Sequence, residues 1–330
     1  MAMLEVKNLR TSFFTGAGEV KAVNGVSFNL EKGKVLGIVG ESGSGKSVTA
    51  YSIMQILEKT GKIVGGSVKF NGQELVGAGE KVMKTIRGNK ISIIFQDPMT
   101  SLNPTYTIGH QLMEAIILHT DRNKKQAYDR AVEMLRLVNV NEPEKRMNQY
   151  PYEFSGGMRQ RIMIAMALAC EPDILIADEP TTALDVTLQA QILELMQSLQ
   201  EELGMAIIMI THDLGVVAQM CDEVIVMYAG SICEQGTADE IFYNPKHEYT
   251  KGLMRSIPTV DNDGERLQPI TGTPIDLLNM PKGCPFAPRC EAAMKICLRE
   301  RCERMEINDS HAAACWMNVK EAMEKEGGEG

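Results

Sequence analysis

The chain has 330 residues, of which 44% are hydrophobic, and a formal net charge of −9. This composition excludes wholesale disorder, and the acidic balance disfavours nucleic acid as the main partner, because phosphate backbones recruit basic surfaces. No apolar run approaches the length that spans a bilayer, and the N-terminus enters a strand pattern directly, so we expect a cytosolic protein without a secretion signal.

Strand and helix patterns alternate along much of the chain. Strands are predicted at 4–9, 20–30, 34–39, 65–72, 91–95, 173–177, 205–210 and 223–227. Helices are predicted at 47–57, 107–137, 156–170, 186–203 and 214–220. This alternation implies a mostly parallel sheet covered by helices, with the helical middle as an inserted subdomain. The tail at 324–330 is predicted to be disordered.

The most specific motif is residues 40–47, which match G-x-x-x-x-G-K-[ST] between a predicted strand and a predicted helix. Loop amides at a helix N-terminus favour phosphate, so a turn without function is a poor alternative. Lys46 is expected to reach the β- and γ-phosphates, and the Ser47 hydroxyl to ligate Mg²⁺. The expected nucleotide-binding residues of this loop are Gly40, Ser42, Gly43, Ser44, Gly45, Lys46, Ser47 and Val48.

Two carboxylates end the buried strand pattern at 173–177. Because side chains alternate along a strand, Asp178 and Glu179 should point in different directions. We assign Asp178 to the metal and Glu179 to the general base, since phosphoryl transfer needs a metal ligand and a group that positions water. Acids at a strand end can also simply face solvent. The pair indicates a catalytic site only because the chain also contains the phosphate loop.

Two further polar residues follow predicted strands and should share the same sheet edge. His212 could bridge the γ-phosphate and the attacking water, and its position after the strand favours this over a capping role beside Asp213. Gln96 could touch Mg²⁺ or its water, although from local chemistry alone a plain loop residue is the better interpretation.

A second helix N-terminus is predicted at Ser155, Gly156 and Gly157. Ser155 is typical of an N-cap, and the two glycines allow close approach to the first turn. Such an end is another phosphate acceptor, and two chains that face each other could use both sites on one triphosphate.

The eight cysteines are unevenly distributed, and five of them fall in the last fifth of the chain. In a reducing cytosol such clustering favours metal over disulfides. These five are Cys284, Cys290, Cys297, Cys302 and Cys315.

With these motifs in this order, residues 1 to about 250 resemble the ATPase subunits of ABC transporters. The resemblance identifies Gln96 as the glutamine loop, 155–157 as the signature, 182–185 as the D-loop and His212 as the switch histidine. It implies a head-to-tail dimer in which each ATP lies between one phosphate loop and the partner's signature. It also implies an aromatic residue stacked on adenine, for which we choose Phe13, with Phe14 close behind.

The segments 95–104, 154–161, 211–217 and 283–290 are similar to the dipeptide and oligopeptide importer branch. In that branch the C-terminal segment can carry a [4Fe–4S] cluster. The pattern carries over onto Cys284, Cys290, Cys297 and Cys315 and leaves Cys302 as a spare. Zinc and no metal are the alternatives, and a structural staple is expected rather than a redox sensor.

The resemblance also implies the architecture. The expected fold is α/β: a P-loop ABC ATPase with a mixed or parallel core sheet, an N-terminal antiparallel β-region, an inserted helical subdomain and a small Cys-rich extension. We expect the nucleotide-binding core at 1–97 and 168–257, the helical subdomain with the signature at 98–167, and the extension at 258–330.

The function that follows is ATP hydrolysis that energises import of di- or oligopeptides from the cytoplasmic face of a membrane. The implied partners are two integral permease subunits, an extracytoplasmic peptide-binding protein and a second ATPase subunit, with a homodimer as the alternative to a heterodimer. Gln96 and the helical subdomain should dock on the permease, mainly through 97–104. The rival hypotheses are a soluble ABC ATPase and an importer of nickel or a glycoside.

Overall fold

The structure, a computed structural model, describes residues 2–97, 101–182, 184–256 and 269–319. The predicted disordered tail, at 324–330, and residues 98–100 of the predicted docking segment lie outside these ranges. The chain divides into two compact units. The first, here the helical unit, comprises residues 1–3, 30–35 and 77–210. The second, here the β unit, comprises residues 4–29, 36–76 and 211–330.

A parallel sheet forms the core of the helical unit. Its strands are β6 (Ile91–Ile94), β7 (Ile174–Asp178) and β8 (Ala206–Thr211), with β7 between the other two. Every residue of β7 and β8 is buried, which explains why both are nearly continuous apolar runs in the sequence. Because the strands are parallel, the segments that follow β6 and β7 leave the same edge of the sheet.

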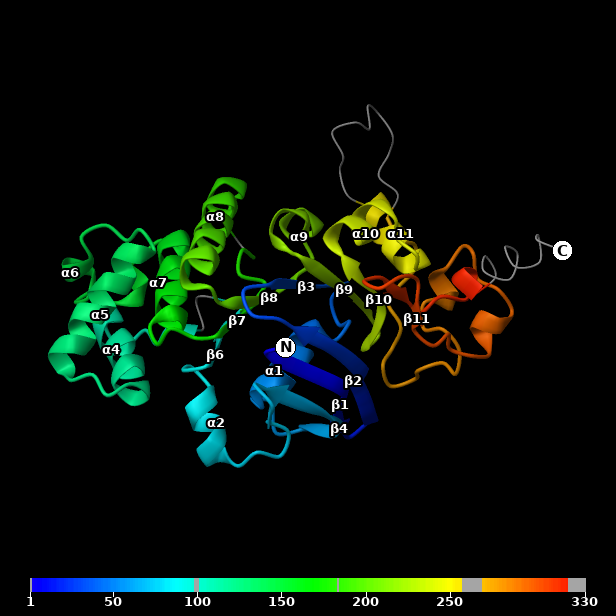
Figure 1. The fold of residues 1–330 in the computed structure, drawn as a ribbon, viewed down its shortest axis with the longest axis horizontal. Helices are drawn as coiled ribbons and strands as arrows, with labels where there is room; N and C mark the ends of the chain where they lie inside the picture. Colours follow the sequence, from blue (N-terminus) through cyan, green and yellow to red (C-terminus); the bar gives the residue numbers. More distant parts are fainter. Residues whose placement is uncertain (1, 98–100, 183, 257–268, 320–330) are drawn as a thin grey trace. The chain divides into compact units, whose positions relative to one another are not determined.

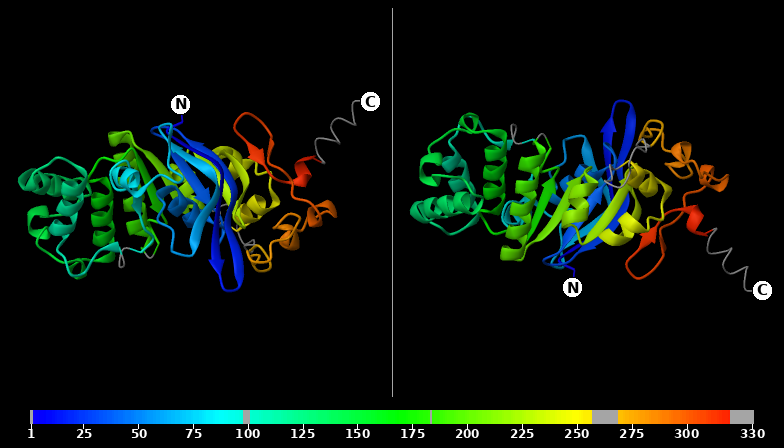
Figure 2. Two further views of the ribbon diagram at one scale, coloured as in Figure 1. Left: turned by 90° about the horizontal axis from the view of Figure 1, so that it is seen from below. Right: turned by 90° about the horizontal axis from the view of Figure 1, so that it is seen from above.

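The helices α4, α5 and α7 pack on one another and gather as a green cluster in both views of Figure 2. The helices of this unit are α2 (Glu80–Ile86), α4 (Ile108–His119), α5 (Lys124–Leu137), α6 (Pro143–Arg146), α7 (Gly156–Leu168) and α8 (Val186–Leu203), with a short 3₁₀ turn η1 (Pro151–Glu153). The single helix predicted at 107–137 is therefore wrong. Asn123 accepts hydrogen bonds from the amides of Lys125 and Gln126 and starts a second helix.

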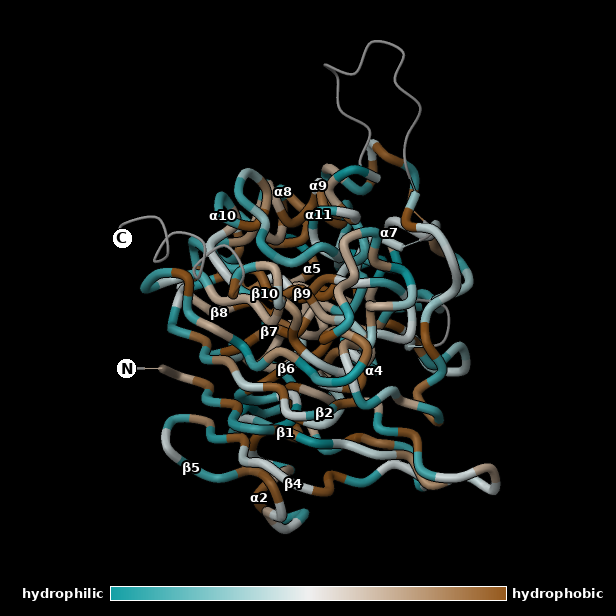
Figure 3. The backbone as a smooth tube through the Cα atoms, turned by 90° about the vertical axis from the view of Figure 1, so that its right-hand side faces the viewer, coloured by the Kyte–Doolittle hydropathy of each residue, from teal (hydrophilic) through white to brown (hydrophobic). Residues whose placement is uncertain are grey.

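An antiparallel sheet opens the β unit, in the order β2–β1–β4–β5, of which Figure 1 labels β2, β1 and β4. Its strands are β1 (Leu4–Thr15), β2 (Gly18–Leu30), β4 (Gly61–Phe70) and β5 (Gln73–Glu74). Hydrophobic and hydrophilic residues alternate along much of β1 and β2 (Figure 3), as expected for a sheet with one buried face. This sheet confirms the predicted antiparallel N-terminal β-region.

The β unit also contains a mixed sheet segment in which β3 pairs in parallel with β9 and β9 pairs antiparallel with β10. Its strands are β3 (Val35–Val39), β9 (Glu223–Tyr228), β10 (Ser231–Thr237), β11 (Met305–Glu306) and β12 (Ala312–Ala313). The helices here are α1 (Lys46–Met54), α9 (Leu214–Met220), α10 (Ala238–Tyr243), α11 (Glu248–Arg255) and the 3₁₀ turns η2 (Ala287–Arg289) and η3 (Ile296–Leu298). The mixed core sheet confirms the predicted fold class.

The C-terminal extension is built into this sheet, because β12 pairs with β10. A buried carboxylate supports the junction. Glu234 is fully buried and accepts hydrogen bonds from the amides of Lys246 and His247, and its Oε1 lies 2.7 Å from His311 Nε2. Since an unpaired buried carboxylate would be costly, the contact with His311 fixes the extension against β10.

No helix within the described ranges is both long enough and apolar enough to cross a bilayer.

Candidate nucleotide-binding site

The phosphate loop connects β3 to α1 within the β unit. Gly45 caps α1 in a left-handed conformation, with φ of 101°. The Lys46 side chain is buried, and its Nζ donates hydrogen bonds to the carbonyl oxygens of Gly40 at 2.8 Å and Glu41 at 3.1 Å. The sequence therefore folds this lysine back over its own loop, where a phosphate oxygen could replace a carbonyl acceptor.

Other groups of the loop also suit an anion. Ser44 is buried, and its Oγ has no hydrogen-bond partner among the described residues. Ser42 and Gly43 are exposed at the tip, and Ser47 and Val48 are half-buried in the first turn of α1. This loop suits a phosphate group, because it brings together the Lys46 cation, the Ser44 hydroxyl and the N-terminus of α1.

The two acids at the end of β7 differ in environment. Asp178 ends the strand and is 1% exposed, whereas Glu179 is half-buried with φ of 49°. The Glu179 carboxylate accepts hydrogen bonds from Gln96 Nε2 at 2.7 Å and from Thr182 Oγ1 at 2.9 Å. Its amide donates to the carbonyl of Ile210 at 2.8 Å.

These contacts hold Glu179 in a backbone conformation that costs a non-glycine residue about 1–3 kcal/mol and that concentrates at functional sites. These contacts fix the Glu179 carboxylate where it can accept a proton. The side-chain oxygens of Asp178 and Gln96 lie at the same sheet edge, where they could ligate a metal ion. Thr182 was predicted only as part of the segment 182–185, of which Ala183 lies outside the described residues. Its bond to Glu179 had no signal in the sequence.

The signature segment begins α7 in the helical unit. Ser155 is exposed, and its Oγ accepts a hydrogen bond from the amide of Met158 at 3.4 Å, as an N-cap does. Gly156 is exposed, and no atom lies within 4 Å of where a Cβ would stand, whereas Gly157 is buried against Leu188. The N-terminus of α7 is therefore open on the Gly156 side.

Comparison with known proteins identifies the family. Residues 23–182 match the ABC transporter family, and residues 233–297 match the oligopeptide/dipeptide transporter C-terminal region. The dipeptide transport ATP-binding protein DppD of Bacillus subtilis is 54% identical over 97% of this chain and 96% of its own length. This chain belongs to the ABC transporter family. The oligopeptide transport ATP-binding protein OppD of Salmonella typhimurium is 56% identical over 89% of this chain and 88% of its own.

Solved structures agree with this assignment to the ABC family. The ATP-binding cassette MJ0796, in a dimeric post-hydrolysis state with ADP and phosphate, superposes with a TM-score of 0.65 at 28% identity. The match covers 72% of this chain and 99% of that cassette. The nucleotide-binding fold thus accounts for most of the chain.

The remaining predicted nucleotide contacts of this ABC subunit lie in the β unit. His212 is exposed, and Asp213 rather than His212 caps α9, accepting from the amides of Gly215 and Val216. Phe13 is half-buried, whereas Phe14 is 46% exposed with Lys62 Nζ at 5.9 Å from its ring centroid. By exposure, Phe14 is as suitable for stacking as our first choice, Phe13.

The four predicted cluster cysteines of the extension line one small cavity of about 20 Å³. They are Cys284, Cys290, Cys297 and Cys315. Burial raises the pKa of the Cys284 and Cys315 thiols and raises that of Cys290 to about 11. Within the described part of the chain, no three His, Cys, Asp or Glu side chains converge as the shell of a single metal ion.

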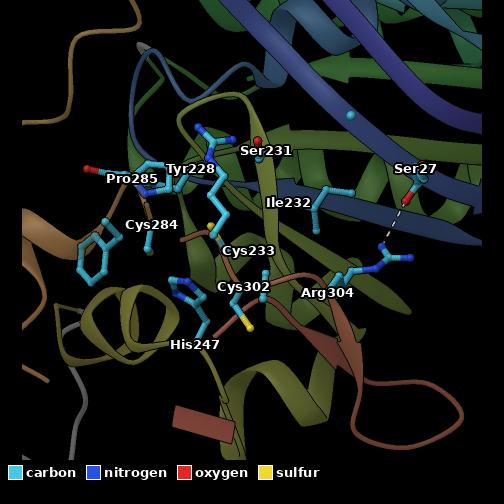
Figure 4. Close-up of a pocket in the computed structure, with 14 residues that line it drawn as sticks. Ser27, Tyr228, Ser231, Ile232, Cys233, His247, Cys284, Pro285, Cys302 and Arg304 are labelled. Atoms are coloured by element: carbon cyan, nitrogen blue, oxygen red, sulfur yellow. Dashed lines mark hydrogen bonds between the residues drawn. The ribbon is translucent and has the colours of Figure 1, made fainter. Parts of the chain in front are cut away.

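A larger cavity of about 310 Å³ lies beside these cysteines in the β unit (Figure 4). Cys233, Cys284 and Cys302 line it, together with Arg304, which donates a hydrogen bond to the carbonyl of Ser27 at 3.3 Å. Cys302 does not line the smaller cavity that the four predicted cysteines share.

Proposed function

We propose that this chain hydrolyses ATP to energise import of di- or oligopeptides. The observation that carries the peptide assignment is the 54% identity, across nearly both chains, to a protein named for dipeptide transport. The matched oligopeptide/dipeptide C-terminal region supports the same branch. Nickel or glycoside import is the second candidate for the cargo, because this subunit is not expected to touch what is transported.

In the proposed reaction, Lys46 and the loop amides hold the phosphates, with Ser44 Oγ as a further buried polar group beside them. Ser47, Gln96 and Asp178 would hold Mg²⁺, which supplies charge neutralisation at the phosphates. Glu179 accepts the proton of the attacking water, and its hydrogen bonds from Gln96 and Thr182 orient the carboxylate. His212 senses the γ-phosphate.

The proposed assembly is a head-to-tail pair with a second, homologous ATPase subunit, or with a second copy of this chain. The exposed start of α7, at Ser155 and Gly156, suits an approach to the partner's nucleotide. The pair would lie on the cytoplasmic face of the membrane against two integral subunits, which an extracytoplasmic binding protein supplies with peptide. Gln96 and the helices of 98–167 would carry the contact with the permease.

The cargo is tested in cells that lack this chain. Uptake of a radiolabelled tripeptide is expected to fall to background, and to return when the wild-type chain is restored but not when Glu179→Gln is supplied. Nickel and glycoside uptake are measured in the same cells as controls. If nickel or glycoside uptake were lost while peptide uptake stayed intact, the chain would be assigned to import of that cargo instead of peptides. No change in any uptake would favour the soluble ATPase.

We further propose that the extension carries a [4Fe–4S] cluster on Cys284, Cys290, Cys297 and Cys315. A four-iron cluster takes one thiolate at each iron, so its ligands surround a cavity instead of meeting at a point. The four cysteines line one cavity, which supports a shared set of ligands, whereas a tetrahedral zinc ion needs its donors to converge. The cavity, of about 20 Å³, has room for roughly one water, so the cysteine segment would have to open to admit the cluster. We infer a structural role, because the extension has little apolar core of its own.

Metal analysis of anaerobically purified protein tests the cluster. We expect about four iron and four sulfide per chain, lost in Cys290→Ser but retained in Cys302→Ser, the matched thiol outside the small cavity. Stoichiometric zinc would overturn the cluster. Equal ATPase rates in reduced and oxidised protein would support a staple and remove the redox-sensor alternative.

A further inference from the structure

An ion pair joins the C-terminal extension to the phosphate loop. Arg289 Nη1 lies 2.6 Å from Glu41 Oε2, and Arg289 Nη2 lies 2.9 Å from Glu41 Oε1. The two side chains are 5% and 25% exposed. This is the bidentate fork that a guanidinium makes with a carboxylate, and its partners lie 248 positions apart in the chain.

Both ends of the pair are held by further contacts. Arg289 Nε donates to the carbonyl of Thr271 at 2.9 Å, and the guanidinium lies about 6 Å from the ring centroids of Tyr228 and Phe286. The amide of Glu41 donates to the hydroxyl of Tyr249 at 2.8 Å. The fork is therefore a built feature of the β unit.

Glu41 is also a direct neighbour of the loop lysine. Its carbonyl oxygen accepts a hydrogen bond from Lys46 Nζ. Its carboxylate would repel a triphosphate if it were free, because it belongs to the loop proposed to hold the phosphates. Arg289 neutralises that charge and holds the carboxylate through two hydrogen bonds.

We propose that Arg289 is a positioning residue of the ATP site. It acts through Glu41, which it holds so that the phosphate loop accepts the triphosphate, and it does not touch the nucleotide. The inference rests on the proposed ATP binding by this loop. It also gives the extension a function, because Arg289 ends η2 directly before Cys290, so the order of the cysteine segment sets the position of the guanidinium.

A charge-removal cycle on the full-length protein tests this role, with Mg·ATP affinity measured by calorimetry. Arg289→Gln leaves Glu41 unpaired and is expected to weaken ATP binding on the order of tenfold, the effect of one charge roughly 10 Å away at an effective dielectric of about 20. Arg289→Gln combined with Glu41→Gln removes both charges and should restore most of the affinity. Arg289→Lys keeps the charge but loses the fork, so it should fall between wild type and Arg289→Gln.

Measuring ATP affinity at two salt concentrations distinguishes an effect of charge from an effect of packing. Raising the ionic strength from about 0.05 M to about 0.5 M should narrow the gap between wild type and Arg289→Gln, since Glu41 is partly exposed. Arg255→Gln is the matched control: its guanidinium pairs with Glu291 at 3.8 Å instead of with a carboxylate of the phosphate loop, and ATP affinity should stay at the wild-type value.

The results that would overturn the proposal are specific. Wild-type affinity in Arg289→Gln would do so, as would a double variant that binds ATP no better than Arg289→Gln. Failure of both Arg289→Gln and the double variant to fold would assign the pair a purely structural role and overturn it as well. Absence of ATP binding by the wild-type chain would instead refute the proposed function.

Discussion

ATP hydrolysis is expected to fall by about 10²–10⁴-fold when Glu179 is replaced by Gln, the range typical of losing a general base. The amide cannot take a proton from water, but it has nearly the size of the carboxylate. Its carbonyl oxygen can still accept the hydrogen bonds from Gln96 and Thr182, so the loop after β7 should keep its conformation. Phosphate release measures the rate, and calorimetry should show ATP binding at the wild-type affinity.

The same variant should accumulate a closed dimer with ATP, because binding continues while the step that opens the pair is blocked. Size-exclusion chromatography with and without ATP measures this. Glu171→Gln is a matched control in the same unit, since Glu171 also has a positive φ, of 56°, and its ion pairs among the described residues are with Arg122 and Arg130. Normal turnover in Glu179→Gln would refute the base assignment.

Much of the fold could be predicted because it depends on local pattern. The buried strands β3, β7 and β8 are continuous apolar runs, and each was predicted to within about a residue. The break between α4 and α5 was missed because apolar residues recur at helical spacing on both sides of it. The local signal that separates the two helices is the capping box of Asn123 and Gln126.

Other elements depended on partners far along the chain. The strand β12 has only two residues, and it pairs with β10 from nearly 80 positions away, at Glu234 with Ala313. Neither alternation nor turn chemistry indicates such a pairing. The helices α10 and α11 span only 238–243 and 248–255, so both are shorter than the window of roughly 11–18 residues over which a helical pattern can be identified.

In the candidate site too, the local features could be predicted from the sequence and the long-range contacts could not. Its residue types were predictable, because a phosphate loop requires Lys46 and Ser47 and phosphoryl transfer requires acids at a strand end. The partners of those residues were not. A single sequence contains no signal that Gln96 bonds Glu179 or that Arg289 pairs with Glu41, since such contacts arise only when the sheet brings distant segments together.

Stability and ATP binding are both expected to be lost when Gly45 is replaced by Ala. Gly45 has φ of 101°, and a Cβ there would stand 2.4 Å from the carbonyl oxygen of Ala22. That oxygen is backbone, so it cannot swing aside as a flexible side chain could. Strain of the dihedral and the steric overlap together should lower the free energy of unfolding by roughly 2–5 kcal/mol, measured by chemical denaturation.

Gly33→Ala separates the two causes. Gly33 also has a positive φ, of 70°, but no atom lies within 4 Å of where its Cβ would stand. It should therefore lose only the dihedral term, about 1–2 kcal/mol, and bind ATP normally. If Gly45→Ala were no less stable than Gly33→Ala, the contact with Ala22 would not constrain the loop. If Gly45→Ala still bound ATP at the wild-type affinity, ATP binding would not depend on the close contact between Gly45 and the Ala22 carbonyl.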